Sequence, residues 1–319
     1  MAVHLVTGAA GFVGSTLVDA LLDNGETVRG VDCFTDYYDP ATKRQNLDAA
    51  TAHPAFDLRT ADLRTAELEP LLDGVEVVHH LAGQPGVRLS WNDGFDEYER
   101  CNVSATQRLL EACRASDIRR IVYASSSSVY GDAAFSPVVE TDATRPDSPY
   151  GVTKLAAEHL CSAYGRNLGL PTVSLRYFSV YGPRQRPDMA HHRLIEAALD
   201  DEPFPLYGDG SQIRDFTFVG DVVRAHLLAA DPGADLEPGT VLNICAGGST
   251  VMRDLIDAVG AAVGRPVEVD KLDAQPGDVR RTGGSNDLAR TLLGWEPTTS
   301  SDDGIQVQVD WHRARRRDR

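Results

Sequence analysis

Three evenly spaced glycines near the N-terminus limit most strongly what this chain can fold into. They occupy the run Thr7-Gly8-Ala9-Ala10-Gly11-Phe12-Val13-Gly14. The apolar run 3–7 before them is typical of a short strand, and the apolar spacing over 12–23 predicts a helix that ends at Asn24-Gly25. Glycines at such a junction permit a tight turn and let the backbone approach a pyrophosphate at the helix N-terminus. The segment therefore predicts the first part of a dinucleotide-binding βαβ unit.

Strand-like and helical segments alternate through the first half of the chain. Further strands are predicted at 27–31, 75–81, 120–124 and 172–177, and helices near 95–115 and 150–168. Such alternation is typical of a parallel sheet with helices on both faces. We therefore expect an α/β fold, a Rossmann-like doubly wound parallel sheet that binds ligands beyond the carboxyl ends of its strands.

After Pro183 the predicted elements become shorter, because prolines and glycine turns separate them. We predict a dinucleotide-binding Rossmann domain over 1–180, to which segments near 214–246 return. Strand material near 216–219 and 241–244 is expected within those returning segments. A smaller α/β substrate-binding lobe is expected from 183–213 and 247–319.

Charge and cysteine usage exclude several classes of function. The net charge of −16 argues against nucleic acid or an anionic membrane as a partner. The five cysteines are widely spaced without a C-x-x-C pair, which indicates reduced thiols, a cytoplasmic location and no zinc motif. His79-His80 are interpreted as packing residues and no metal site is predicted. No stretch is long and apolar enough to span a membrane, and the arginine-rich end 313–319 is expected to be solvated and partly disordered.

An acidic residue follows the second predicted strand. A carboxylate at Asp32 can accept both ribose hydroxyls and would repel a 2′-phosphate, so NAD is favoured over NADP. Arg29 and Arg44 leave NADP open as the alternative, and Arg44 is included among the cofactor-binding candidates. Asp62-Leu63 is expected at the adenine, and the small residues of Leu81-Ala82-Gly83 are expected where cofactor backbone passes closely.

Tyr150 and Lys154 form a Tyr-x-x-x-Lys pair downstream of a four-serine run, Ser125 to Ser128. Residues four apart share one face of a helix, so the Lys154 ammonium is expected beside the Tyr150 hydroxyl. A nearby cation favours the phenolate and lowers the pKa of a tyrosine towards neutrality, which makes it a usable base. The chain has only three lysines, so a lysine at this offset is a rare coincidence. The alternative interpretation is an ordinary amphipathic helix surface.

These residues resemble the extended short-chain dehydrogenase/reductases that act on nucleotide sugars, over essentially the whole chain. The stretches that carry the resemblance are TGAAGFVG (7–14), YASSSSVYG (123–131), SPYGVTK (148–154), LRYFSVYGP (175–183), GDGSQIRDF (208–216), PGDV (276–279) and LGWEP (293–297). Within that family, three further strings look most like UDP-glucuronate 4-epimerases. They are FTDYYD (34–39), GQPGVRLSW (83–91) and RPDMA (186–190).

The resemblance implies a role for each matching position. Tyr150 would be the base, Lys154 its pKa partner and ribose contact, and Ser126 the hydroxyl on the reacting sugar oxygen. Ser179 and Arg186 would meet a sugar carboxylate, which a guanidinium can bind with two bonds. The implied NAD-binding residues are Gly8, Gly11, Phe12, Val13, Gly14, Asp32, Arg44, Asp62, Leu63, Leu81, Ala82, Gly83, Tyr150 and Lys154. The implied UDP-sugar-binding residues are Arg88, Ser126, Ser127, Ser128, Ser179, Arg186, Arg214 and Asp278.

The implied reaction is reversible oxidation at C4 of UDP-glucuronate, with hydride passing to tightly bound NAD and returning to the other face of a 4-keto sugar. Related dehydratases carry Asp-Glu where Ser127-Ser128 stand, and decarboxylases carry Glu at the second position, so the serines favour epimerisation. The alternatives are a UDP-glucose 4-epimerase, a UDP-glucuronate decarboxylase, and a non-catalytic NAD-binding sensor or scaffold.

Three departures from the subgroup pattern stand out. Gly83 replaces a usual alanine, Ser179 a usual threonine, and Arg184-Gln185 a usual tryptophan and glycine. The last change is expected to add a charge beside the carboxylate site. The apolar residues of the predicted helices 95–115 and 150–168 favour a homodimer that pairs these helices.

Overall fold

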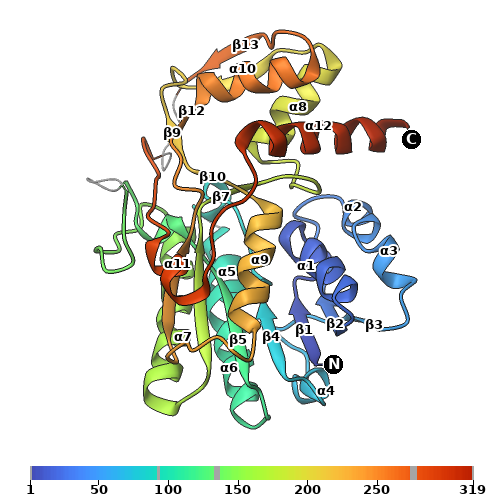
Figure 1. Cartoon of the computed structure of the whole chain (residues 1–319), viewed down its shortest axis with the longest axis vertical. Coiled ribbons are helices and arrows are strands. Elements are labelled where there is room, and N and C mark those ends of the chain that lie inside the picture. The colour runs from blue at the N-terminus through green and yellow to red at the C-terminus, as the bar shows by residue number, and fades with distance from the viewer. Residues whose placement is uncertain (1, 92–93, 133–136, 274–278, 318–319) are drawn as a thin grey trace.

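The computed structural model describes residues 2–91, 94–132, 137–273 and 279–317, and its centre is a seven-stranded parallel sheet (Figure 1). The strand order is β11-β6-β5-β4-β1-β2-β3, and all six neighbouring pairs are parallel. The strands are β1 (Val3–Thr7), β2 (Thr27–Asp32), β3 (Phe56–Thr60), β4 (Val77–His80), β5 (Arg120–Ser126), β6 (Thr172–Tyr177) and β11 (Thr240–Ile244). The order reverses between β1 and β4, so a ligand-binding crevice is expected beyond their carboxyl ends.

Helices cover both faces of this sheet because the strands are apolar on both sides. One face packs on α4 (Glu69–Leu72), α6 (Ala105–Arg114) and α7 (Pro149–Leu168). The other packs on α1 (Phe12–Asp23), α3 (Asp48–Thr51), α9 (Val219–Ala230) and α11 (Asp287–Leu293). The remaining elements of this half are α2 (Pro40–Gln45), the short helix η1 (Arg88–Ser90), α5 (Phe95–Tyr98), the π-helix η3 (Glu99–Ser104) and the 3-10 turn η4 (Ser127–Val129). The predicted doubly wound α/β fold is therefore confirmed.

A second, smaller layer stands beyond the carboxyl ends of the strands, at the top of Figure 1. Its helices are α8 (Ala190–Asp200), α10 (Met252–Val263) and α12 (Ser301–Arg317), which enclose an apolar cluster of their own. Three two-stranded sheets accompany them: β7 (Ser179–Tyr181) with β10 (Phe216–Phe218), β8 (Phe204–Tyr207) with β13 (Val269–Leu272), and β9 (Ile213–Arg214) with β12 (Thr250–Val251). This layer covers one end of the sheet, where ligands are expected.

Two details differ from the predicted division of the chain. The strand near 216–219 does not join the large sheet but pairs with β7, whereas β11 does return to it beside β6. Residues 287–295 were predicted to belong to the smaller lobe. Instead, Ala289 and Trp295 are fully buried in the cluster between the large sheet and α9. Trp295 is held there because its indole N–H donates to the carbonyl of Asp221 at 2.8 Å.

Residues 313–317 of the arginine-rich end continue helix α12, because their side chains have partners on other elements. Arg313 donates to the Val263 carbonyl at the end of α10, and Arg316 contacts Asp200 and Glu196 on α8. Among the described residues, no helix is both long and apolar enough to cross a membrane.

Candidate active site

The glycine turn between β1 and α1 has the geometry of a phosphate cradle. Gly8 has a φ of 69°, which a residue with a Cβ rarely adopts. A Cβ on Gly14 would lie 2.1 Å from the Gly8 carbonyl oxygen, so only glycine lets α1 begin this close to the strand. Helix α1 starts at Phe12 and directs its free backbone N–H groups at this turn. One pocket lies beyond the carboxyl ends of β1 and β4, at the switch point where the strand order reverses. It is lined by all five predicted residues of the turn: Gly8, Gly11, Phe12, Val13 and Gly14.

Asp32 ends β2 at the rim of the same pocket. Its carboxylate accepts from the Ala10 N–H at 3.1 Å and from the Phe34 N–H at 2.7 Å, so the glycine turn fixes its orientation. Each oxygen retains a lone pair for a ribose hydroxyl. Arg29 is engaged elsewhere, with Asp57 and the carbonyl of Leu71. The Arg44 guanidinium stacks 4.3 Å from the Phe34 ring centre, and Arg44 does not line the pocket. The donor set therefore fits NAD better than its 2′-phosphorylated form.

The residues predicted for the adenine and for the close wall of the cofactor site belong to the same pocket. Asp62, Leu63, Leu81, Ala82 and Gly83 all line it. The structure also explains the glycine at position 83. A Cβ there would lie 2.7 Å from Oδ1 of Asn102, which accepts from the Gln84 N–H at 2.7 Å. Asn102 lies on the π-helical turn η3, an irregularity often found at functional sites.

Tyr150 lies on the first turn of α7, where the dinucleotide pocket meets a larger cleft towards the smaller lobe. Burial raises the pKa of Tyr150 above its ordinary value, while a hydrogen bond with Ser126 and the nearby charge of Arg186 lower it. Ser126 ends β5, and its Oγ also accepts from the Ser128 N–H at 3.1 Å. The serine turn and the tyrosine are thus joined directly.

Lys154 lies one helical turn after Tyr150 on α7, and both residues line the same pocket. Its ammonium donates to the Ala124 carbonyl at the end of β5 and lies 4.4 Å from the Tyr123 ring centre. Burial lowers the pKa of Lys154 to about 8, against Cys161 and Glu158, which raise it. Arg186, which the resemblance assigned to the substrate, also lowers the pKa of Tyr150. The predicted action of Lys154 on Tyr150 stays a prediction.

The cleft beyond Tyr150 gathers the predicted sugar-binding residues. It is lined by Arg88, Ser126, Ser127, Ser128, Ser179, Arg186 and Arg214. Arg88 stacks 4.2 Å from the Tyr207 ring centre, and Arg214 donates to the Val279 carbonyl at 2.7 Å. In a chain of net charge −16, these three guanidinium groups supply the local positive field that an anionic ligand needs. Asp278 lies outside the described residues.

The expected extra charge beside the carboxylate site is not there. Arg184 has a left-handed φ of 66°, and its guanidinium lies 2.7 Å from the Asp19 carboxylate on α1. Gln185 is buried and donates to the Val180 carbonyl at 2.9 Å. The two substituted residues are therefore structural, because the loop turns their side chains away from the cleft.

Several cleft residues were missed because nothing in the sequence alone assigns them a role. Tyr37 and Asp188 lie within two of the strings that carried the resemblance, and Tyr37 donates to Asp188 at 3.3 Å. Tyr98 packs edge-on against Tyr150, with ring centres 6.2 Å apart. Tyr177 lines both pockets, and its hydroxyl contacts His226. Most of them are single tyrosines, which are too common in a sequence to identify a site.

Three features together define a dinucleotide-dependent enzyme: a Rossmann-type sheet, a glycine cradle with a carboxylate at the next strand end, and a half-buried tyrosine beside a serine turn. Residues 4–245 match the model of the NAD-dependent epimerase/dehydratase family. The chain belongs to this family, and the predicted family, NAD cofactor and enzyme class are confirmed.

Individual relatives agree over nearly their whole length. The chain is 42% identical over 306 residues, 96% of each protein, to an uncharacterised UDP-glucose epimerase, YtcB, of Bacillus subtilis. It superimposes with a TM-score of 0.94 on the UDP-glucuronic acid 4-epimerase of Bacillus cereus solved with UDP-glucuronic acid and NAD, at 40% identity over 98% of this chain and 99% of that one. MoeE5 with UDP-glucose and NAD gives a TM-score of 0.87 at 42% identity over 99% of both chains.

Proposed function

We propose that this protein is a UDP-glucuronate 4-epimerase, which interconverts UDP-glucuronate and UDP-galacturonate through a 4-keto intermediate. The observation that carries the proposal is one cleft that contains a half-buried tyrosine, a hydroxyl-rich turn and a guanidinium. Tyr150, Ser126 and Arg186 line it together. The similarity to the Bacillus cereus enzyme solved with UDP-glucuronic acid and NAD supports the same substrate class.

Tyr150 takes the proton from the C4 hydroxyl, and Ser126 holds the same oxygen. Their mutual hydrogen bond lowers the pKa of Tyr150 and places both hydroxyls at one point of the cleft. Bound NAD supplies the acceptor for the C4 hydrogen and later returns it. Tyr150 then gives its proton back to the oxygen of the inverted alcohol, so that no net proton is consumed.

Arg186 and the serines recognise the sugar carboxylate. The Arg186 guanidinium binds the Asp188 carboxylate with two bonds, and a glucuronate carboxylate would be bound in the same two-bond manner. Ser127, Ser128 and Ser179 supply neutral donors around it. UDP-glucose, whose sugar carries no carboxylate, would offer this guanidinium no such partner.

The absence of carboxyl groups on the serine turn favours epimerisation over loss of CO₂. The 4-keto intermediate of glucuronate is a β-keto acid, and decarboxylation ends with a proton given to the nascent enolate. Ser127 and Ser128 are hydroxyls on the η4 turn, which are far weaker acids than a carboxyl group. The turn beside the sugar therefore lacks the proton donor that a decarboxylase needs.

The proposal is tested by incubating the purified protein separately with UDP-glucuronate and UDP-glucose and identifying products by mass and NMR. UDP-galacturonate is the expected product, formed faster than UDP-galactose. Dominant UDP-galactose formation would favour a UDP-glucose 4-epimerase, the second candidate, which the 42% identity to YtcB supports. CO₂ release comparable with epimer formation would identify a decarboxylase. Bound NAD without turnover would identify a sensor or scaffold.

We also propose that the enzyme is a cytoplasmic homodimer with separate NAD-binding and nucleotide-sugar-binding domains. Exposed apolar side chains on α5 and α7 support a dimer through these helices: Phe95, Val152 and Leu168 are 42%, 46% and 54% exposed. Light scattering after gel filtration tests this, and a Val152→Glu variant is expected to shift the protein to the monomer mass. An unchanged dimer would place the interface elsewhere.

A further inference from the structure

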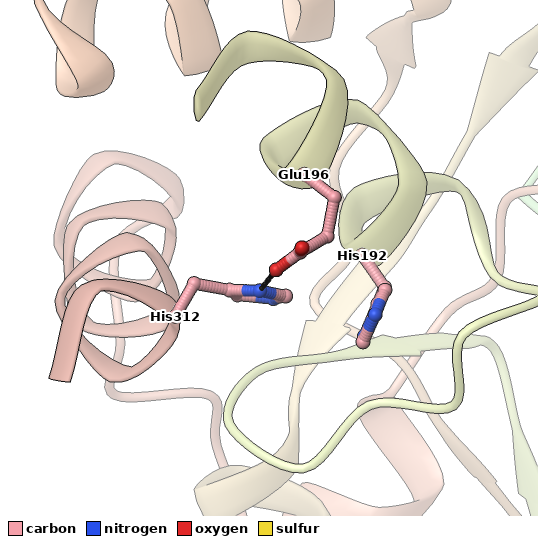
Figure 2. Close-up of side chains that lie close together, drawn as sticks. All are labelled: His192, Glu196 and His312. Carbon is pink, nitrogen blue, oxygen red and sulfur yellow. Dashed lines mark hydrogen bonds and ion pairs between the residues drawn. The ribbon is translucent and has the colours of Figure 1, made fainter. Parts of the chain in front are cut away.

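Two helices far apart in sequence bring two imidazoles and a carboxylate together, away from the cleft that holds Tyr150 (Figure 2). His192 and Glu196 lie one helical turn apart on α8, and His312 projects towards them from α12. One ligand atom from each side chain lies within 4.8 Å of those of the other two. The i, i+4 spacing on α8 directs both of its side chains to the same side.

His192 has a ring nitrogen ready to bind an electron-pair acceptor. Its Nδ1 lies 2.8 Å from the Gln185 carbonyl oxygen. A carbonyl only accepts, so Nδ1 carries the hydrogen and Nε2 carries the lone pair. Ligating histidines usually hold their second nitrogen in this way, by donation to a carbonyl or carboxylate.

His312 presents a buried nitrogen that the protein leaves unsatisfied. The residue is 1% exposed, and its Nδ1 contacts Oε1 of Glu196. Its Nε2 has no hydrogen-bond partner among the described residues. The ring packs against that of His192 with centres 4.6 Å apart. A buried polar atom without a partner is uncommon and indicates a group or ion that completes it.

Glu196 supplies the negative charge. Burial raises the pKa of Glu196, but hydrogen bonds from His312 and Arg316 bring it down to about 2, so the carboxylate is ionised at neutral pH. Its side chain is 32% exposed, which leaves room for water on one side of the cluster. Two imidazoles and one carboxylate make a ligand set that suits zinc and similar transition metals better than magnesium or calcium.

We propose that His192, Glu196 and His312 form a binding site for one divalent transition-metal ion of the zinc type, with water at the remaining positions. The ion fastens the C-terminal helix α12 to α8. It also connects to Gln185, the residue before Arg186, through His192. The Gln185 backbone carbonyl accepts from His192 Nδ1, and the Gln185 side-chain oxygen accepts from the His192 backbone N–H at 2.9 Å. The ion therefore stabilises the smaller lobe and takes no part in the reaction.

Arg316 competes with this ion and provides a distinctive test. Its guanidinium donates to Oε2 of Glu196 at 2.6 Å, but it also binds Asp200 with bonds of 2.7 and 2.8 Å. Asp200 thus keeps the arginine paired when the metal takes Glu196. An Arg316→Gln substitution removes the competing charge, so metal affinity is expected to rise severalfold in this variant.

The experiment titrates zinc into the untagged, chelator-treated full chain by calorimetry, with thermal unfolding in parallel. One ion per chain and a higher Tm are expected. His192→Asn and His312→Asn retain an Nδ1-like donor but lose Nε2, and together with Glu196→Gln they are expected to weaken binding by roughly 10–100-fold. The controls Cys33→Ser and His53→Asn remove an exposed thiol and an exposed imidazole and should change nothing.

Failure of wild-type protein to bind one zinc ion would overturn the proposal, as would binding that survives both histidine variants or is lost in Cys33→Ser. If the variants do not fold, the wild-type cobalt spectrum decides. Visible d–d bands without a thiolate charge-transfer band would support the imidazole and carboxylate site. A thiolate band, or no bound cobalt, would rule it out.

Discussion

Arg186 and Asp188 form a two-bond ion pair inside the cleft that holds Tyr150, with Nε–Oδ1 and Nη2–Oδ2 distances both of 3.0 Å. Asp188 thus occupies the position that a substrate carboxylate would take on this guanidinium. Tyr37 donates to the same Asp188 at 3.3 Å, so the pair is held on both sides. Binding of an acidic sugar must replace or share Asp188, which couples recognition to a local rearrangement.

Arg186→Ala is expected to lower kcat/KM for UDP-glucuronate by roughly 10–100-fold, because a hydrogen bond to a charged group contributes about 1.5–3 kcal/mol. The loss for UDP-glucose should be much smaller. Initial rates with both substrates measure the difference. Arg184→Ala is the matched control, since Arg184 pairs with Asp19 and should affect neither substrate. Equal losses for both sugars in Arg186→Ala would contradict carboxylate recognition.

The same pair is expected to control the pH dependence of the reaction. Tyr150 acts as its phenolate, so the rate rises with pH through its pKa, and Arg186 lowers that pKa. Asp188→Asn removes the charge that neutralises Arg186, so the rising limb of the kcat profile should move to lower pH. Arg186→Ala should move it to higher pH. Profiles of kcat against pH with UDP-glucose, which does not need the carboxylate contact, check both signs. Shifts in the same direction would disprove the coupling.

Tyr150→Phe is expected to leave NAD bound while lowering kcat by roughly 10²–10⁴, the usual contribution of a general base. The fall in kcat should persist at high pH, where Tyr150 of the wild-type enzyme is fully ionised and its ionisation no longer limits the rate. NAD content by absorbance and single-turnover rates measure the two effects. Tyr164→Phe, about four turns further along α7 and bonded to Glu111, is the control and should retain activity. An unchanged kcat in Tyr150→Phe would remove this phenol from the mechanism.

The sequence predicted the elements that depend on local periodicity, but it did not predict the elements that form only through contacts with distant residues. Helix α1 and strand β6 have the predicted bounds, because their apolar spacing and turn residues are contained in the segments themselves. Strands β8 and β13 lie more than sixty residues apart and pair only in the folded lobe, so neither was predicted. The π-helical turn at 99–104 is likewise set by packing against α7.

The site shows the same limit at single side chains. Tyr150 and Ser126 were predicted correctly as neighbours, because the strand end and the helix start converge at the switch point. The bond of Lys154 to the Ala124 carbonyl was not predicted, because it depends on where β5 ends beside α7. The side of the loop to which Arg184 turns was wrong too, because its φ is left-handed. A pattern of residue types locates a site, whereas hydrogen bonds from other elements orient its members.

A buried ion pair beneath the serine turn gives the last prediction. Arg176 on β6 binds Glu158 on α7 with bonds of 2.7 and 2.9 Å, and their side chains are 5% and 2% exposed. Glu158 also accepts from the Ser125 hydroxyl at 2.6 Å. The pair therefore connects the end of β5 to the helix that carries Tyr150 and Lys154.

Arg176→Leu should destabilise the protein by about 3–5 kcal/mol, because it leaves the Glu158 carboxylate buried without a counter-charge. The double variant Arg176→Leu/Glu158→Leu should recover much of that loss, since no buried charge remains. Urea unfolding of the two single variants and the double variant measures the coupling. Arg100→Leu, which breaks an exposed pair with Asp96, should change stability by no more than about 0.5 kcal/mol. If the double variant is as unstable as the sum of the single ones, then hydrogen bonds to Ser125 and Tyr130, rather than compensation of charge, make this pair necessary.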